Sequence, residues 1–188
     1  SNQMKSLVND LFEYTKVQQH GAPVNFMPVD LGQLLEQVCA SFELEGENRG
    51  IEVSSQTTPT PLVIDGDPEK LGRVFSNLVA NGIKYGHGAS YIRLDAIQHS
   101  DQVTVTVAND GERIPADSLS HLFERFYRVE ASRSKATGGT GLGLAIVKSV
   151  VDLHHGNVEV QSNDNQTAFI VTLPTKQEKS GASNDETH

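Results

Sequence analysis

The sequence predicts one α/β domain in which amphipathic helices and short strands alternate, with further segments at both ends. Two observations support this fold class. Apolar residues recur at helical spacing in four segments of the chain, and strict alternation over residues 92–96 and 103–107 predicts an antiparallel hairpin. The 188 residues, of which 37% are hydrophobic, are enough for one compact core with appendages.

The predicted elements follow in order along the chain. Asp30 and Asp67 are expected to cap the second and third helices, because each precedes an apolar helical stripe. Helices are predicted over residues 3–19, 30–48, 67–85, 116–122 and 144–154. Strands are predicted over residues 51–55, 62–64, 92–96, 103–107, 158–161 and 168–173, and residues 21–28 are predicted to be a linker or a short extended segment.

Composition excludes several classes of function. Fifteen Lys and Arg against 24 Asp and Glu give a formal charge of −9, so a general nucleic-acid surface is not expected. The single Cys39 lies on an apolar helical stripe, which favours a buried thiol over a ligand or nucleophile. No apolar run approaches the roughly 20 residues that span a bilayer and no secretory signal is present, so a cytoplasmic domain is expected.

Residues 138–147, GGTGLGLAIV, place four glycines directly before an apolar helical pattern. Glycine backbone amides can approach an anion closely, and the start of a helix adds unpaired N–H groups and a positive dipole end. The P-loop pattern fails because Leu144 and Ala145 follow the last glycine, and the Rossmann pattern fails because residues 131–137 are polar. A phosphate loop or a flexible turn before a surface helix remain as the two interpretations.

Two other segments could serve the same ligand. Asn77, Asn81 and Lys84 share one face of the predicted helix 67–85, which indicates either a ligand site or a solvated helix face. Residues 124–135 hold four basic and two acidic side chains, a local charge of +2 directly before the glycines. This basic run fits a polyphosphate ligand, but a mobile charged surface loop would have the same composition.

Four motifs in this order resemble the N, G1, F and G2 boxes of sensor histidine kinases. They are NLVANGIKY at 77–85, NDGERIP at 109–115, FERFYR at 123–128 and GTGLGL at 139–144. The resemblance implies an open two-layer α/β sandwich with a mixed sheet packed on one face by helices, the Bergerat fold of gyrase-type and Hsp90-type ATPases. It also implies three parts: the end of a dimerisation helix with its linker over 1–28, the ATP-binding catalytic domain over 29–174, and a disordered polar tail over 175–188.

The resemblance assigns roles to individual residues, with ATP and Mg²⁺ as the ligands. Asn81 would bind Mg²⁺ and, with Asn77 and Lys84, face the phosphates, while Tyr85 would face adenine and ribose. Arg128, and less directly Arg125, would neutralise phosphate charge beside a lid placed at 129–138. The base would contact Asn109, Gly111, Ile114 and Thr167, and the phosphates would meet the segment Gly139, Thr140, Gly141, Leu142 and Gly143.

Three positions depart from the family pattern. Asn109 stands where the family usually has the aspartate that accepts a hydrogen bond from adenine, so weaker or less selective adenine binding is expected. Arg113 and His155 each replace a usual glycine, and Arg113 could either obstruct the rim of the site or contact the ligand. None of the seven histidines precedes an acidic residue, as the family's phosphoacceptor does, so this chain should not autophosphorylate alone.

The sequence therefore predicts the catalytic domain of a two-component sensor histidine kinase, a protein-histidine kinase. It would position Mg·ATP for phosphoryl transfer to a histidine on its own phosphoacceptor domain and then to a response-regulator aspartate. The intact protein is expected to be a homodimer anchored in a membrane. One alternative is a nucleotide-binding module impaired in phosphotransfer, which the residues Asn109 and Arg113 suggest. An ATP-hydrolysing relative is a second alternative, although Asn77 stands where such enzymes have a catalytic glutamate.

Overall fold

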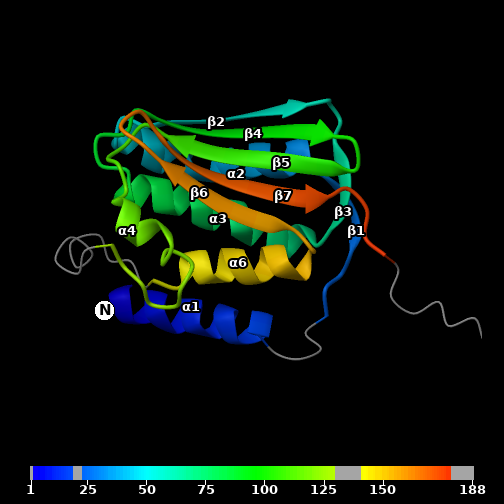
Figure 1. The fold of residues 1–188 in the computed structure, drawn as a ribbon, viewed down its shortest axis with the longest axis horizontal. Helices are drawn as coiled ribbons and strands as arrows, with labels where there is room; N and C mark the ends of the chain where they lie inside the picture. The colour runs from blue at the N-terminus through cyan, green and yellow to red at the C-terminus, as the bar shows by residue number, and fades with distance from the viewer. Residues whose placement is uncertain (1, 19–22, 130–140, 179–188) are drawn as a thin grey trace, which may run out of the picture.

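A computed structural model describes residues 2–18, 23–129 and 141–178 of the protein (Figure 1). Five strands form one mixed sheet in the order β2-β4-β5-β7-β6, in which β2 runs parallel to β4 and the other neighbours are antiparallel. The strands of this sheet are β2 (Glu52–Thr58), β4 (Tyr91–His99), β5 (Gln102–Asn109), β6 (Asn157–Ser162) and β7 (Thr167–Pro174). A separate antiparallel pair joins β1 (Met27–Asp30) to β3 (Val63–Gly66).

The helices lie on one face of the sheet. Figure 1 shows α2, α3 and α6 side by side beneath the strands, with α1 on the outer side of α6. These helices are α1 (Asn2–Gln18), α2 (Leu31–Asn48), α3 (Pro68–Tyr85) and α6 (Gly143–Leu153), and the short α4 covers Ala116–Leu119. A two-layer sandwich with a mixed sheet covered on one face confirms the predicted fold class.

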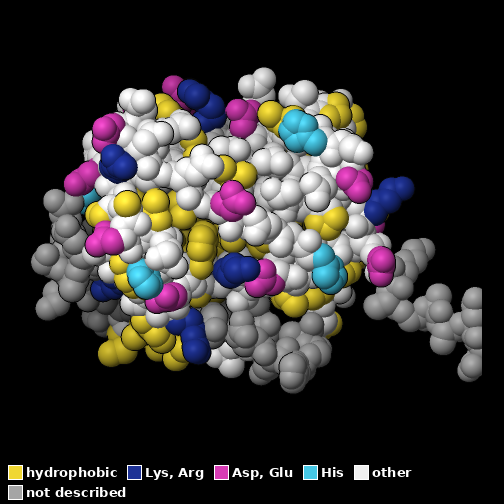
Figure 2. All heavy atoms as spheres, in the orientation of Figure 1, with side chains coloured by type: hydrophobic (Ala, Val, Ile, Leu, Met, Phe, Trp, Pro, Cys, Tyr) yellow, Lys and Arg dark blue, Asp and Glu magenta, His cyan; other side chains and the backbone are white. Residues whose placement is uncertain are grey.

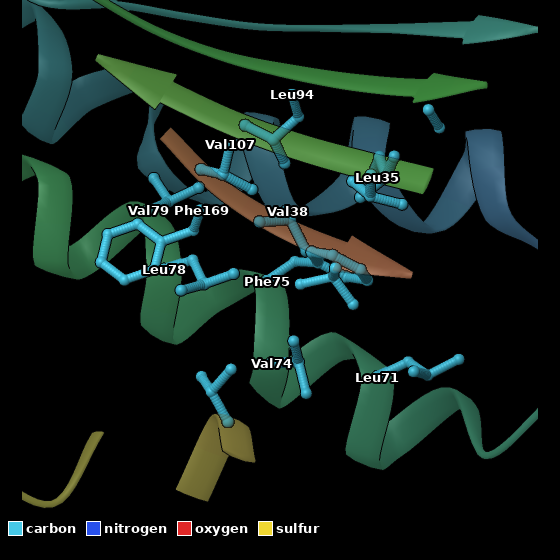
Figure 3. Packing of buried hydrophobic residues seen from close by; sticks show 14 of the residues in the cluster. Leu35, Val38, Leu71, Val74, Phe75, Leu78, Val79, Leu94, Val107 and Phe169 are labelled. Atoms are coloured by element: carbon cyan, nitrogen blue, oxygen red, sulfur yellow. The ribbon is translucent and has the colours of Figure 1, made fainter. Parts of the chain in front are cut away.

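The hydrophobic core fills the space between the two layers. Val103, Val105 and Val107 alternate along β5 and are almost completely buried, because a strand points every second side chain to the same face. Figure 3 shows side chains of α3, among them Phe75 and Leu78, extending from the helix layer toward the strands. Burial of each such side chain stabilises the fold by about 1.5–3 kcal/mol, so the apolar stripes of the helices fix their orientation.

Both predicted helix caps are formed. The carboxylate of Asp30 accepts a 3.2 Å hydrogen bond from the backbone N–H of Gln33, and that of Asp67 accepts one of 3.1 Å from Lys70. The second carboxylate oxygen of Asp67 also accepts the backbone N–H of Asn25, at 3.1 Å. The cap of α3 thus also holds the segment that leads from α1 into the domain.

Two parts of the chain differ from expectation. Residues 27–30 form β1, whereas residues 21–28 were predicted as a linker or a short extended segment and Asp30 as the start of a helix. The strand forms because β3 supplies the hydrogen-bond partners that so short a strand needs. The segment predicted to be a disordered tail, 175–188, includes two residues that are hydrogen-bonded to the domain. The N–H of Thr175 donates to the carbonyl of Asp101, and that of Gln177 donates to the carboxylate of Asp65. These contacts extend the ordered domain beyond residue 174, and residues 179–188 lie outside the described part of the chain.

The outer face of α1 carries exposed hydrophobic side chains. Figure 2 shows hydrophobic atoms gathered over the start of this helix, at the lower left of the view. The exposed residues are Met4, Val8, Leu11 and Phe12. Such a contiguous apolar face on a helix indicates a surface that another element covers. None of the helices in the described ranges has both the length and the apolarity needed to cross a membrane.

Candidate nucleotide site

The polar face of α3 meets the beginning of α6. The side-chain amide of Asn77 donates a hydrogen bond to the backbone carbonyl of Gly143, with 3.2 Å between Nδ2 and the oxygen. Asn81 and Lys84 follow Asn77 on the same helix at spacings of four and three residues, and all three are half-buried. Residues 66 positions apart in the sequence therefore come together, as the N and G2 motifs predict.

The glycine segment has a backbone geometry that requires glycine. Gly141 adopts a φ of +79°, and a Cβ atom there would lie 2.7 Å from the backbone of Phe126. The two backbones are joined, because the N–H of Phe126 donates to the carbonyl of Gly141 at 2.9 Å. The F motif thus lies directly against the G2 motif.

α6 presents its first amides where the glycine segment ends. The helix begins at Gly143, and the side chain of its N-cap residue, Leu142, makes no capping hydrogen bond. The first N–H groups of a helix have no partner within it and carry the positive end of the helix dipole. This end of α6 is therefore suited to a phosphate, and it lies against Asn77.

A second cluster lies at the end of β5. Asn109 is 7% exposed, and its Oδ1 atom accepts a 2.9 Å hydrogen bond from the backbone N–H of Gly111. Gly111 is packed against the backbone of Gly86, since a Cβ at Gly111 would lie 2.6 Å from the Cα of Gly86. Thr167, 3% exposed, is the direct cross-strand partner of Asn109 in the β5–β7 ladder. The predicted base-contacting residues are thus neighbours.

Ser162 completes this cluster, and the sequence did not single it out. Its hydroxyl oxygen accepts the backbone N–H of Ile114 at 2.9 Å and shares a 2.6 Å hydrogen bond with the hydroxyl of Thr167. Ser162 and Thr167 are paired across the β6–β7 ladder. Counting back from the turn at residues 163–166 would have placed Ser162 opposite Thr167, which is the one signal that could have identified it.

Asp110 fixes the loop beside Asn109. Its carboxylate accepts the backbone N–H groups of Ser90 and Tyr91 at 2.7 and 3.1 Å, and it also bonds the hydroxyl of Ser90. Desolvation by burial raises the pKa of Asp110, but the hydrogen bonds from Ser90 and Tyr91 outweigh it, and the net pKa is lowered. An ionised Asp110 therefore joins the end of β5 to the start of β4.

Arg113 is directed to the turn between β6 and β7. Its guanidinium lies 3.3 Å from the carboxylate of Asp164, and both side chains are exposed. Exposed ion pairs of this kind contribute little to stability.

The remaining predicted site residues lie around these two clusters or outside the described residues. Lys84 and Tyr85 are half-buried at the end of α3, Arg128 is half-buried, and Arg125 is exposed. Gly139, Thr140 and the lid predicted at 129–138, apart from Val129, lie outside the described residues. Within the described ranges, no three His, Cys, Asp or Glu side chains gather as metal ligands.

A groove of about 470 Å³ lies on another side of α3, between that helix, α2 and β1. Pro68, Gly72 and Ser76 line it at a spacing of four residues. That spacing keeps them on a helix face distinct from the one that carries Asn77 and Asn81. The groove is therefore separate from the candidate site, since no predicted site residue lines it.

The fold and the two clusters define a class of protein: an ATP-binding catalytic domain of the sensor histidine kinase type. The chain belongs to the family of histidine kinase-, DNA gyrase B-, and HSP90-like ATPases, which matches residues 66–177. The sensor protein VanS of Enterococcus faecium is 36% identical over 171 residues, which are 91% of this chain and 44% of VanS. The chain thus spans less than half the length of that relative, and the family predicted from the four motifs is confirmed.

Solved structures agree with this assignment. The catalytic domain of the histidine kinase ThkA is 26% identical with a TM-score of 0.72, covering 81% of this chain and 97% of that one. ThkA in complex with the response regulator TrrA shares the fold at 23% identity and a TM-score of 0.75, with 93% and 48% covered. Full-length ShkA in complex with AMPPNP is 26% identical with a TM-score of 0.80, with 93% and 36% covered.

Proposed function

We propose that this chain binds Mg·ATP and presents the γ-phosphate to a histidine on the phosphoacceptor domain of a two-component sensor kinase. The observation that carries the proposal is the hydrogen bond between Asn77 and Gly143, which joins the polar face of α3 to the first turn of α6. A triphosphate placed there would meet amide side chains on one side and helix amides on the other. The complex of ShkA with the ATP analogue AMPPNP supports this reading.

The phosphate end would depend on backbone amides and cations. The first N–H groups of α6, which have no partner within the helix, would bind phosphate oxygens, and Lys84 and Arg128 would offset the negative charge of the phosphates. In phosphoryl transfer the protein contributes chiefly positioning and electrostatic stabilisation, because charge spreads over the transferring group. Asn77 would hold α6 at the distance from α3 that the triphosphate requires.

The base would lie at the second cluster. Ile114 offers an apolar side chain to the ring, and Ser162 holds its backbone in place. Asn109 and Thr167 offer polar groups in a buried setting, where a hydrogen bond is most selective. The two ends of the site are carried by the same helix, since Gly82 in α3 lies beside Asn109 and Asn77 lies beside α6.

The residues present fit Mg²⁺ as an accompanying ion. Mg²⁺ prefers hard oxygen ligands and keeps several waters, so one protein oxygen together with phosphate oxygens is enough. Asn81 would supply that oxygen from its amide, one helical turn from Asn77. When bound, the ion would neutralise charge on the phosphates and help to align them.

The remaining partners follow from the relatives. The acceptor histidine would come from the kinase's own phosphoacceptor domain, and the phosphoryl group would pass to a response regulator like the one bound by ThkA. The exposed apolar side chains of α1 suit the dimerisation helices of an intact homodimer. The intact protein would be anchored in a membrane, with this domain in the cytoplasm.

Calorimetric titration of ATP with and without Mg²⁺ tests the proposal. Wild-type protein should bind ATP in a magnesium-dependent manner, and Asn81→Ala should weaken that binding by at least about tenfold, as the loss of a metal ligand implies. Ser76→Ala is the matched control, because Ser76 lies on the same helix but lines the separate groove. Unchanged magnesium-dependent binding in Asn81→Ala would show that the site is wrongly placed.

A further inference from the structure

The side-chain amide of Asn109 has a defined orientation. Its neighbour at 2.9 Å is the backbone N–H of Gly111, which can only donate a hydrogen bond, so the atom facing it must be the carbonyl oxygen Oδ1. The NH₂ group must then point the other way. It lies on the side of Gly82, where a Cβ atom would be 3.7 Å from Nδ2.

The opposite orientation is disfavoured. A flipped amide would place its NH₂ group against the N–H of Gly111, which is buried and would lose its acceptor. The surroundings are also tight, because Cβ atoms at Gly86 and Gly111 would lie only 3.1 and 2.9 Å from Oδ1. The donor side of Asn109 is therefore the one that remains for a ligand.

That donor lies at the base end of the site. Gly82 directly follows Asn81 on α3, and Thr167 faces Asn109 across the β5–β7 ladder. Thr167 is joined through Ser162 to the backbone of Ile114. A base bounded by these residues would meet an NH₂ group from Asn109, whereas an aspartate would bond Gly111 with one oxygen and offer the other as an acceptor.

We propose that Asn109 recognises the base by donating a hydrogen bond to it, so that this site binds 6-oxopurine nucleoside triphosphates at least as tightly as ATP. The reason is complementarity: the C6 oxygen of hypoxanthine or guanine accepts a hydrogen bond, whereas the C6 amino group of adenine donates one. With its C6 amino group facing Asn109, ATP would either meet the NH₂ group donor to donor or force the flip that deprives Gly111 of its partner. This inference rests on the proposed nucleotide site.

The test compares the affinities of ATP, ITP and GTP, each with Mg²⁺, for wild type, Asn109→Asp and Asn48→Asp. ITP differs from ATP at C6 without the 2-amino group of guanine, so the ratio of the ITP and ATP dissociation constants isolates the contact. This ratio should be about one or lower for wild type, and Asn109→Asp should raise it on the order of tenfold. Asn48→Asp, which adds the same charge at the exposed end of α2, should leave the ratio unchanged.

A wild-type preference for ATP over ITP of tenfold or more would overturn the inference, as would an unchanged ratio in folded Asn109→Asp. Even if Asn109→Asp does not fold, the ratio measured for wild type tests the inference. If wild type bound none of the three nucleotides, the proposed function would fail and the inference with it. Binding of ATP with strong discrimination against ITP would refute the inference alone and leave the proposed function intact.

Discussion

The imidazole of His154 accepts a 3.0 Å hydrogen bond from the backbone N–H of Asp67, so that the end of α6 is joined to the beginning of α3. Its other ring nitrogen lies 2.9 Å from the carbonyl oxygen of Val150 and must donate to it. One nitrogen accepts and the other donates, so the ring is neutral in the folded protein. Only 1% of the side chain is exposed, and desolvation lowers the pKa of His154, a shift that bonding to Val150 only partly offsets.

We therefore expect the fold to lose stability in mildly acidic solution. Because the folded pKa lies below the unfolded value of 6.5, the unfolded chain binds a proton first. The contribution of His154 is complete above pH 6.5 and declines as the pH falls from there through the folded pKa, by at most about 1.4 kcal/mol per pH unit. Urea unfolding between pH 7.5 and 5 measures it. His154→Gln should be less stable at pH 7.5 but show a smaller decline, and equal declines would contradict the prediction.

His155, the next residue, adopts a left-handed backbone conformation with a φ of +58°. This conformation costs a non-glycine residue about 1–2 kcal/mol, while a glycine loses about 0.5–1 kcal/mol more backbone entropy on folding. His155→Gly should therefore be neutral or raise the unfolding free energy by up to about 1 kcal/mol. His155→Val, whose β-branched side chain tolerates this region poorly, should lower it by more than about 1 kcal/mol. Thermal unfolding of both variants is the measurement, and equal effects would argue against backbone strain.

Gly141 should tolerate no side chain. Gly141→Ala places a Cβ atom on a residue with a φ of +79°, 2.7 Å from the backbone of Phe126. Because the contact is with backbone atoms, rotation of a side chain cannot relieve it. We expect a loss of more than about 1 kcal/mol in stability and weaker ATP binding, because the start of α6 would shift. Gly50→Ala is the matched control, since Gly50 also has a positive φ but no atom within 4 Å of the added Cβ. If both variants lost stability equally and kept their affinity for ATP, the close approach to Phe126 would be unimportant.

The helices and the order of the motifs were predictable because their signals are local. A cap such as Asp30 and an apolar stripe such as that of α3 can be read from a window of one or two turns, and both agree with the structure. For β1 the sequence predicted only a linker or a short extended segment over 21–28, because Pro28 weakens the local signal and the pairing with β3 depends on the fold.

Long-range polar contacts could not be predicted either, because they depend on the fold and not on a short window of the sequence. The helix whose C-cap residue is His154 was predicted, but the hydrogen bond between His154 and Asp67 spans 87 residues. The polar residues Thr175 and Gln177 have the composition of a disordered tail, yet they bond to Asp101 and to the carboxylate of Asp65. Composition indicates whether a segment would be disordered in isolation, whereas tertiary hydrogen bonds determine whether it is ordered in the folded domain.

Ser162 offers a test of the base end of the site that does not involve Asn109. Ser162→Ala removes the acceptor of the Ile114 N–H and the partner of the Thr167 hydroxyl, both at least partly buried. Leaving such groups unpaired should lower the unfolding free energy by about 1–2 kcal/mol and weaken ATP binding several-fold.

Binding of inorganic tripolyphosphate should not change in Ser162→Ala, because that ligand reaches only the phosphate end at Asn77 and α6. Ser120→Ala is the control, since Ser120 is exposed after α4. Calorimetric titration of both ligands separates the two ends of the site, because a base contact changes the affinity for ATP alone. An equal loss of tripolyphosphate affinity would mean that Ser162 acts on the whole fold, and the assignment of the base to this cluster would lose its support.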